Sequence, residues 1–378
     1  MSDLAQLKPA YYPFIVLKVS SQCNLACKYC HATNLPKKEL LMSIELFSRV
    51  LSEFIPFFKA QRNRPELQLI FHGGEPLLAG LAFYREVIEL ESHIDTTDIL
   101  LINGIQTNGT LITEDWIELF KQGNFRVGIS VDGPEALHNK YRMDKCGRPT
   151  FNRIAESIEM LQDDNLPFGL LSVVTADTPS YCEKFFHFLI EWDISRINFL
   201  PRIDSTTQKN VHAYSKFMRD FFDLWLAYDA PFSVLTFQDI LEQLSGKQGR
   251  YCYFTEKCRK FIFIDTLGRI FPCDRFMDDE RYYIGKISSS SFEMVESAPI
   301  GLQKKLPKAC SGCKVQHICS GGCPALIDPA TGRDFYCSAR KALIQHIIRK
   351  LQEYDLSPDE ILQRFDQRTV QWADTITL

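Results

Sequence analysis

Three cysteines lie within the eight residues of CNLACKYC, at positions 23, 27 and 30. A structural zinc site needs a fourth ligand, and no fourth cysteine lies nearby. His31 could serve only with unusual geometry, because it directly follows Cys30. A cubane iron–sulfur cluster can instead be held by three thiolates, which leaves one iron open. Cys23, Cys27 and Cys30 therefore predict a catalytic cluster with one position free for a ligand.

A second group of cysteines lies in the C-terminal third of the chain. Its members are Cys252, Cys258, Cys273, Cys310, Cys313, Cys319, Cys323 and Cys337. Eight thiolates suit two fully ligated 4Fe–4S clusters or two zinc sites with four cysteines each. Of the 13 cysteines in the chain, this leaves Cys146 and Cys182 without a predicted ligand role.

Composition narrows the class of protein. The N-terminus lacks a secretory signal, so dense cysteine indicates metal binding in a reducing cytoplasm rather than disulfides. The net charge of −4 gives no electrostatic footprint for nucleic acid or for an anionic membrane surface. The longest apolar runs are far too short to span a bilayer. The sequence therefore predicts a cytoplasmic protein without nucleic-acid or membrane partners.

Up to about residue 205, strand-length apolar runs alternate with amphipathic helical stretches. The expected strands are 14–20, 67–72, 100–107, 125–131, 168–174 and 196–200. The expected helices are 43–60, 81–94, 113–122, 150–164 and 181–192. Ser43 and Thr113 are capping-type residues at two of the helix starts. This alternation predicts an α/β fold with a parallel sheet, and six such units can form an open or partial barrel.

The motifs between these elements converge on one edge. Ligands of parallel sheets bind at the C-terminal ends of the strands. The cysteine triplet follows the first expected strand, HGGEP the second, TNGT the third and SVDGP the fourth. Gly73 and Gly74 can bring backbone close to a ligand, and Glu75 can accept hydrogen bonds from an ammonium group.

The alternation stops after residue 205, which predicts further units in the chain. We expect a barrel over residues 1–205, a bridging helical region over 206–250 and a cysteine-rich domain over 251–345. The tail, 346–378, is expected to be helical, with a proline-containing break.

A CxxxCxxC loop after the first strand of a βα barrel, followed by HGGEP after the second, resembles the radical S-adenosylmethionine (SAM) superfamily. The resemblance implies a partial (β/α)6 barrel and an open iron chelated by the amino and carboxylate groups of SAM. It also implies that Tyr29 lies against the adenine, and that Ser130 and Arg142 bind the ribose or methionine part. A guanidinium suits the ligand carboxylate. The alternative for Ser130 and Arg142 is a polar strand end with a surface salt bridge.

The spacing of the later cysteines resembles the SPASM extension of radical SAM enzymes that modify peptides and proteins. This resemblance implies two auxiliary clusters, and thus three 4Fe–4S clusters in all. The nearer auxiliary cluster would use Cys252, Cys258, Cys273 and Cys323. The outer one would use Cys310, Cys313, Cys319 and Cys337. Zinc remains an alternative, because tetrahedral thiolate suits either metal.

The resemblance also implies the chemistry. A radical derived from SAM would take hydrogen from a side-chain carbon, in a net two-electron oxidation that needs an electron donor such as flavodoxin or ferredoxin. In sulfatase maturases, the aspartate that matches Asp274 acts as a base. A partly desolvated carboxylate suits that role. The alternative is a salt bridge between Asp274 and Arg275 or another cation.

Two enzyme functions compete. Residues 106–112 and 128–142 closely resemble anaerobic sulfatase-maturating enzymes and related peptide maturases. His31 and His72 stand where sulfatase maturases usually have an aromatic residue and a glutamine, and HGGEPLL looks more like cyclophane-forming maturases. We therefore expect a maturase that cross-links a ribosomally synthesised precursor peptide. The alternative is a sulfatase maturase that converts cysteine or serine to formylglycine.

Two further considerations bear on this expectation. Only about 13 residues precede the first expected strand, too few for the winged-helix module that grips the leader in many peptide maturases. The barrel, the bridging helices or a separate protein would then bind the leader, for example along a strand edge. A non-catalytic, zinc-rich interaction protein is the remaining alternative.

Overall fold

The computed structural model describes most of the chain. The described residues are 14–30, 40–59, 66–95, 97–203, 207–229, 231–258, 261–277, 279–288, 292–294, 302–304 and 306–369.

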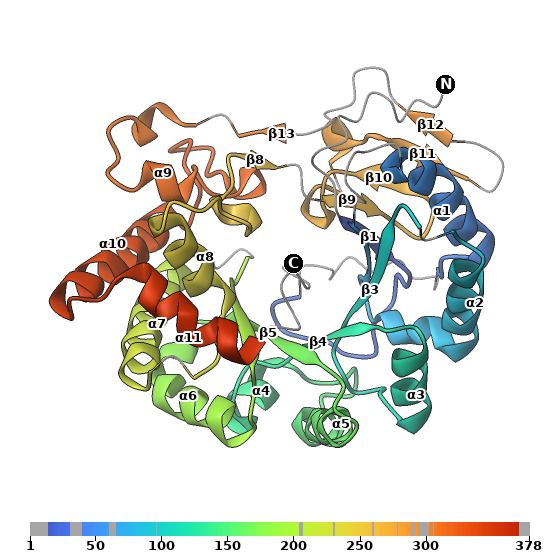
Figure 1. The fold of residues 1–378 in the computed structure, drawn as a ribbon, viewed down its shortest axis with the longest axis horizontal. Helices are drawn as coiled ribbons and strands as arrows, with labels where there is room; N and C mark the ends of the chain where they lie inside the picture. Colours follow the sequence, from blue (N-terminus) through green and yellow to red (C-terminus); the bar gives the residue numbers. More distant parts are fainter. Residues whose placement is uncertain are drawn as a thin grey trace.

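Six parallel strands, paired in sequence order, form the first part of the fold. They are β1 (Phe14–Lys18), β2 (Glu66–His72), β3 (Leu100–Thr107), β4 (Arg126–Ser130), β5 (Phe168–Val174) and β6 (Arg196–Pro201). All six predicted strands are confirmed, with ends shifted by two residues at most. The sheet curves into an open ring (Figure 1), so the predicted partial barrel is confirmed.

Helices cover the outer face of this ring (Figure 1). They are α1 (Ile44–Lys59), α2 (Gly80–Ser92), α3 (Glu114–Gln122), α4 (Glu135–Tyr141), α5 (Phe151–Asp163) and α6 (Cys182–Glu191). Five of these were predicted, whereas the short helix α4 was not. Leu46 N donates to Ser43 Oγ (3.2 Å) at the start of α1. Thr113 occupies the cap position of α3 without a side-chain hydrogen bond.

Aromatic side chains fill the layer between sheet and helices. Phe71 of β2 meets Tyr84 of α2 edge-on, with ring centroids 5.2 Å apart, and Tyr84 meets Trp116 of α3 at 5.3 Å. All three rings are buried. Burying a large apolar side chain contributes about 1.5–3 kcal/mol. This packing holds α2 and α3 against the sheet, and the C-terminal ends of its strands, here called the rim, carry the sequence motifs.

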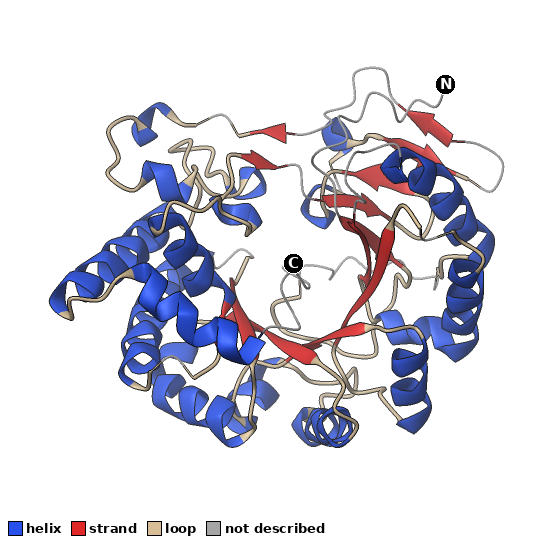
Figure 2. Cartoon of the chain, viewed as in Figure 1, coloured by secondary structure: helices blue, strands red, loops and turns tan. Residues whose placement is uncertain are grey.

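The cysteine-rich region continues the sheet of the barrel, which the sequence did not predict. Strand β9 (Phe261–Ile264) pairs in parallel with the free edge of β1, Phe14 opposite Phe261. Strands β10 (Arg269–Phe271), β11 (Gly285–Ile287) and β12 (Phe292–Met294) follow in antiparallel order. With β7 (Ser233–Val234) on the opposite edge, the described residues form an 11-stranded sheet (Figure 2). The added strands have only two to four residues each, too few to show a pattern.

The remaining elements form the left side of the molecule in Figure 1. They are α7 (Thr207–Ala227), α8 (Leu235–Leu244), β8 (Lys257–Cys258), β13 (Leu302–Gln303), α9 (Gln316–Cys319), α10 (Cys337–Glu353) and α11 (Pro358–Thr369). Helix α10 packs against α7, and α11 against α8. The tail therefore forms two helices with a break, as expected, while the domain boundaries stay a prediction. None of the described helices is both long and apolar enough to cross a bilayer.

One buried carboxyl makes the stability of this fold depend on pH. Glu91, at the end of α2, accepts a hydrogen bond from Asn103 Nδ2 of β3 (2.6 Å), and its Oε1 has no hydrogen-bond partner within the described part of the chain. Burial raises the pKa of Glu91 to about 7, although the Asn103 bond acts to lower it. The folded state therefore holds this proton more tightly than the unfolded state. The resulting stabilisation is fully present below about pH 4.5 and is lost as the pH rises through about 7.

We predict that Glu91→Gln removes this loss. Between pH 5 and pH 8 the variant should gain about 1–3 kcal/mol of unfolding free energy relative to the wild type. Anaerobic denaturant unfolding at the two pH values measures the difference. Glu86→Gln, at an exposed position of the same helix, is the matched control. Identical pH dependence in the wild type and Glu91→Gln would contradict the prediction.

Candidate functional site

A cavity of about 530 Å³ opens where β1 and β2 end. Its lining residues are Lys18, Cys23, Leu25, Ala26, Cys27, Lys28, Cys30, His72, Gly73, Gly74, Lys145, Phe263, Asp274 and Met277. The structure thus gathers the three triplet cysteines, both glycines of HGGEP and Asp274 around one space. These residues come from three segments that lie far apart in the sequence.

Backbone hydrogen bonds hold the cysteine loop in place. Ala26 N donates to Met143 O (2.8 Å), and Lys28 N to Tyr141 O (3.0 Å), so the loop is fixed to the end of α4. Burial raises the pKa of the Cys23 thiol to about 12, and it also raises the pKa of Cys27. Cys23 and Cys27, both partly buried, are therefore poor thiolates unless a positive charge joins them. This donor set fits a bound iron–sulfur cluster.

The turn after β2 packs directly onto the segment after β1. Gly74 has a φ of +54°, and a side chain there would overlap the carbonyl oxygens of Gln22 and Ser20. Glu75 N donates to Gln22 O (2.8 Å). Only glycine permits this approach, which brings the HGGEP turn against the triplet loop.

Glu75 ties the turn after β2 to the turn after β3. Its buried carboxylate accepts from Thr107 Oγ1 (2.6 Å), Asn108 N (2.8 Å) and Leu77 N (3.0 Å). Burial raises the pKa of Glu75 to about 7 against the opposing effect of these donors. The expected hydrogen bond from Glu75 to a ligand ammonium stays a prediction.

Asp132, which was not predicted as a site residue, follows β4 and connects Tyr29, Arg142 and Val173. Asp132, 1% exposed, accepts from Arg142 Nε (3.0 Å), from Val173 N (3.0 Å) and from the Tyr29 hydroxyl. The Arg142 guanidinium also lies over the Tyr29 ring, 5.4 Å from its centroid. Arg142 is itself buried, so the alternative of a surface salt bridge does not describe it. In the sequence, Asp132 lies within SVDGP, between the predicted ligand-binding residues Ser130 and Arg142, and this position could have indicated it.

The neutral side chains of His138 and Thr150 complete the network around Asp132 and Arg142. Burial lowers the pKa of His138 to about 3, so its ring is neutral and Nδ1 accepts from Asp132 N (3.3 Å). Its Nε2 lies 3.1 Å from Thr150 Oγ1, which donates to Arg142 O (2.8 Å).

At the end of β4, Ser130 Oγ accepts from Gln106 Nε2 (3.1 Å). The binding roles of Tyr29, Ser130 and Arg142 stay predictions.

The later cysteines form two spatial groups. Burial raises the pKa of Cys310, and its neighbours Cys337, Cys319 and Cys313 raise it further. Cys252 and Cys323 both act electrostatically on Tyr253, and Cys323 and Cys273 both act on Arg275. Each group contains cysteines of one predicted set only, and the side chain of Cys258 lies outside the described residues. The assignment of ligands to clusters stays a prediction.

The spacing of the thiols bears on the choice of metal. Within the described ranges, no three Cys, His, Asp or Glu side chains come close enough together to hold one ion. A cubane binds each thiolate through a separate iron, so it tolerates wider spacing than a single zinc ion. All cysteines with described side chains are free, Cys146 being exposed and Cys182 buried.

Asp274 follows a predicted cluster ligand and also lines the cavity. The Cys273 thiol donates to Asp274 Oδ1 (2.9 Å). Lys18 Nζ approaches Met277 Sδ (3.8 Å), and Met277 N donates to Asp274 O (3.2 Å). Lys18 was not predicted as a cavity residue. It is the last residue of β1, and its inward position follows from the alternation along that strand.

Comparison with known proteins places this site in context. The sequence model of the Radical SAM superfamily matches residues 17–189. The chain is 31% identical over 360 residues to a cysteine-type anaerobic sulfatase-maturating enzyme of Clostridium novyi, with 89% of this chain and 95% of that protein covered. It is 30% identical over 379 residues to a serine-type anaerobic sulfatase-maturating enzyme of Bacteroides thetaiotaomicron, with 90% of each covered. The solved structure of native anSMEcpe with bound AdoMet and Cp18Cys peptide has a TM-score of 0.79 and 27% identity, over 92% of this chain and 99% of that one.

These relatives overturn the expectation of a peptide cross-linking maturase. That expectation weighted His31 and His72 above the rest of the chain. His31 lies outside the described residues, and His72 lines the cavity at the end of β2. A side chain at the rim can differ while the reaction stays the same, whereas the similarity to sulfatase-maturating enzymes extends over about nine-tenths of the chain. The non-catalytic zinc protein is excluded by the same relatives.

We predict that Asp132→Asn leaves Arg142 as an uncompensated buried charge and costs roughly 3–5 kcal/mol of unfolding free energy. Asp220→Asn, which breaks the exposed pair with Lys216, should cost at most about 1 kcal/mol. Anaerobic denaturant unfolding measures both. The double variant Asp132→Asn/Arg142→Gln should recover part of the loss. An Asp132→Asn protein as stable as Asp220→Asn would show that this pair does not hold the rim.

Proposed function

The chain belongs to the radical SAM superfamily, in the sequence family of the anaerobic sulfatase-maturating enzymes, and we propose that it oxidises a cysteine or serine of a sulfatase polypeptide to formylglycine. It is a radical SAM enzyme that acts on a protein or peptide, with a 4Fe–4S cluster and SAM as cofactors. One observation carries the proposal. The cavity of about 530 Å³ has the cysteine triplet and the Asp274 carboxylate on its wall.

The proposed reaction needs the groups that this cavity supplies. The substrate side chain loses one hydrogen atom from Cβ, one proton and one electron, which leaves a C=O group from serine or a C=S group from cysteine. Water then replaces sulfur in the cysteine case, and hydrogen sulfide leaves. The cluster and SAM, when bound, supply the radical that takes the hydrogen atom. Asp274 accepts the proton, since this residue lines the same cavity.

The rim residues would bind SAM. Cys23, Cys27 and Cys30 would hold the cluster, and the turn of Gly73 and Gly74 would face the ligand. Arg142 and Tyr29, held together by Asp132, would bind the carboxylate and the adenine. Ser130 and Glu75 would add hydrogen bonds to the ribose and the ammonium group. The cavity is walled in part by Leu25, Ala26 and Phe263, which helps to exclude water from a reactive intermediate.

Two auxiliary 4Fe–4S clusters are part of the proposal. The outer set, Cys310, Cys313, Cys319 and Cys337, gathers around Cys310. The inner set would use Cys252, Cys258, Cys273 and Cys323. Auxiliary clusters can accept the electron that leaves the substrate. A one-electron donor such as a flavodoxin or ferredoxin would reduce the SAM-binding cluster.

We predict that the reconstituted, reduced protein produces formylglycine under anaerobic conditions. It is mixed with SAM and with sulfatase-derived peptides that carry cysteine or serine at the target position. Mass spectrometry should show a serine peptide lighter by two hydrogen atoms, or a cysteine peptide that has also exchanged sulfur for oxygen. The same peptides with alanine at the target are the control. 5′-Deoxyadenosine with every target peptide unchanged would contradict the proposed substrate.

We predict that Asp274→Asn loses peptide oxidation by roughly 10²–10⁴-fold, the usual contribution of a positioned base. The variant should keep its iron content and should still cleave SAM in the absence of peptide turnover. Mass spectrometry of the peptide and of 5′-deoxyadenosine measures the two activities separately. Asp279→Asn, on the turn paired with Arg281, is the control. Wild-type peptide turnover by Asp274→Asn would exclude Asp274 as the base.

A further inference from the structure

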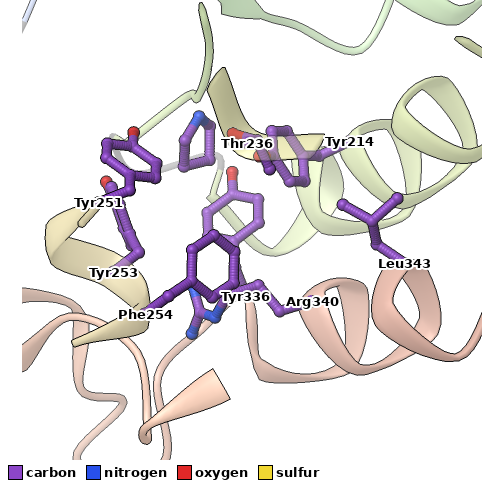
Figure 3. A pocket seen from close by; sticks show the side chains of 9 residues that line it. Tyr214, Thr236, Tyr251, Tyr253, Phe254, Tyr336, Arg340 and Leu343 are labelled. Atoms are coloured by element: carbon purple, nitrogen blue, oxygen red, sulfur yellow. The ribbon is translucent and has the colours of Figure 1, made fainter. Parts of the chain in front are cut away.

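Arg340 occupies a buried position between the two C-terminal cysteine sets. It lies one turn into α10, after Cys337, and only 4% of it is exposed. Figure 3 shows its side chain among those of a small pocket that Tyr336 and Phe254 also line. Its guanidinium carbon is 5.8 Å from the centroid of the Tyr253 ring. This guanidinium therefore lies within a largely apolar, aromatic surrounding.

The acidic partner of Arg340 connects both cysteine sets. Arg340 Nη2 lies 2.7 Å from Asp334 Oδ1, and the Asp334 side chain is fully buried. Asp334 Oδ2 also accepts from Cys323 N (2.7 Å), and the Asp334 carbonyl accepts from Cys337 N (2.9 Å). Asp334 Oδ1 accepts from Tyr336 N (2.7 Å). The carboxylate thus divides its charge among several donors and does not satisfy the whole guanidinium.

The guanidinium presses against the loop that carries the cysteines. Gly322 has a φ of +81°, and a side chain there would overlap Arg340 Nη2. The loop therefore requires glycine next to Cys323. The Cys319 thiol also interacts with this guanidinium. Burial acts to lower the pKa of Arg340, while Asp334 and then Cys319 raise it.

Part of this guanidinium has no acceptor. Arg340 Nε is buried and has no hydrogen-bond partner among the described residues. A buried donor without an acceptor is costly, so an acceptor beside Arg340 Nε would stabilise the folded protein. Sulfur atoms of a cluster held by Cys310, Cys313, Cys319 and Cys337 would supply one, because Cys337 lies one turn before Arg340 on α10 and Cys319 also interacts with the guanidinium.

We propose that Arg340 is a positioning residue of the outer auxiliary site. Its guanidinium raises the reduction potential of an iron–sulfur cluster bound there. The inference rests on the proposed function, since it assumes the auxiliary clusters. A buried cation and N–H donors near the sulfurs stabilise the more negative, reduced state. Arg340 thereby makes the outer site a better electron acceptor.

The test measures potentials in the full chain. Cys23→Ala/Cys27→Ala/Cys30→Ala removes the ligands of the SAM-binding cluster, so the C-terminal clusters alone contribute to an anaerobic redox titration followed by electron paramagnetic resonance. In this background Arg340→Gln should lower one midpoint potential. We expect about a tenfold change in the ratio of oxidised to reduced cluster, or about 59 mV for a one-electron couple. Arg340→Lys keeps the charge and should shift less.

Two further variants separate this role from simple damage. Arg349→Gln removes a positive charge from an exposed position of the same helix, paired with Glu353, and should leave both potentials unchanged. Asp334→Asn removes the opposing charge and should shift the potential upward. Opposite shifts in Asp334→Asn and Arg340→Gln support the inference. If Arg340→Gln does not hold its iron, Asp334→Asn alone tests the sign, and an unchanged or lowered potential in that variant would overturn the inference.

Each remaining outcome counts against the inference. Unchanged potentials, or shifts in the same direction for both charge changes, would overturn it while leaving the proposed function in place. A triple-alanine background without iron and acid-labile sulfide would overturn the auxiliary clusters and this inference together. Failure to form formylglycine, with potentials that shift as expected, would overturn only the proposed substrate.

Discussion

The pairing of β1 with a strand on each side is the constraint on which the site depends. β2 pairs with one edge of β1 and β9 with the other, both in parallel. The first pairing brings HGGEP beside the cysteine triplet. The second carries the segment of Cys273 and Asp274 to the inner face of β1, where Lys18 meets Met277. A single five-residue strand thus connects the predicted SAM site to the predicted base.

The two faces of β1 have different tasks because successive side chains point in opposite directions. Ile15 and Leu17 belong to the core under the helices, whereas Phe14 and Val16 join Phe263 and Phe271 in a separate inner cluster. Lys18 continues the inner series at the cavity. Moving the strand by one residue would exchange the faces and direct Lys18 into the core. The same register therefore fixes both the hydrophobic packing and the cavity wall.

The sequence was most informative where elements are long and buried. The six barrel strands were predictable because each is a short, largely apolar run of strand length between helical stretches. β9 to β12 were not predictable, because their pairing depends on β1, more than 240 residues earlier in the chain. Asp132 was missed because its role comes from Tyr29, Arg142 and Val173, which only the fold brings together. The preference for a cross-linking maturase was wrong because two rim positions carry little information about the reaction.

Buried charges recur at the points where loops must hold a fixed shape. Glu75 joins two turns of the rim, the Asp132–Arg142 pair joins the triplet loop to β4 and β5, and the Asp334–Arg340 pair joins the two C-terminal cysteine sets. Such pairs contribute little net stability, because desolvation offsets their attraction. They do penalise any arrangement that leaves one partner alone, and that penalty selects a single loop geometry. A radical reaction requires this selectivity, since a displaced loop would admit water or misplace the abstracted hydrogen.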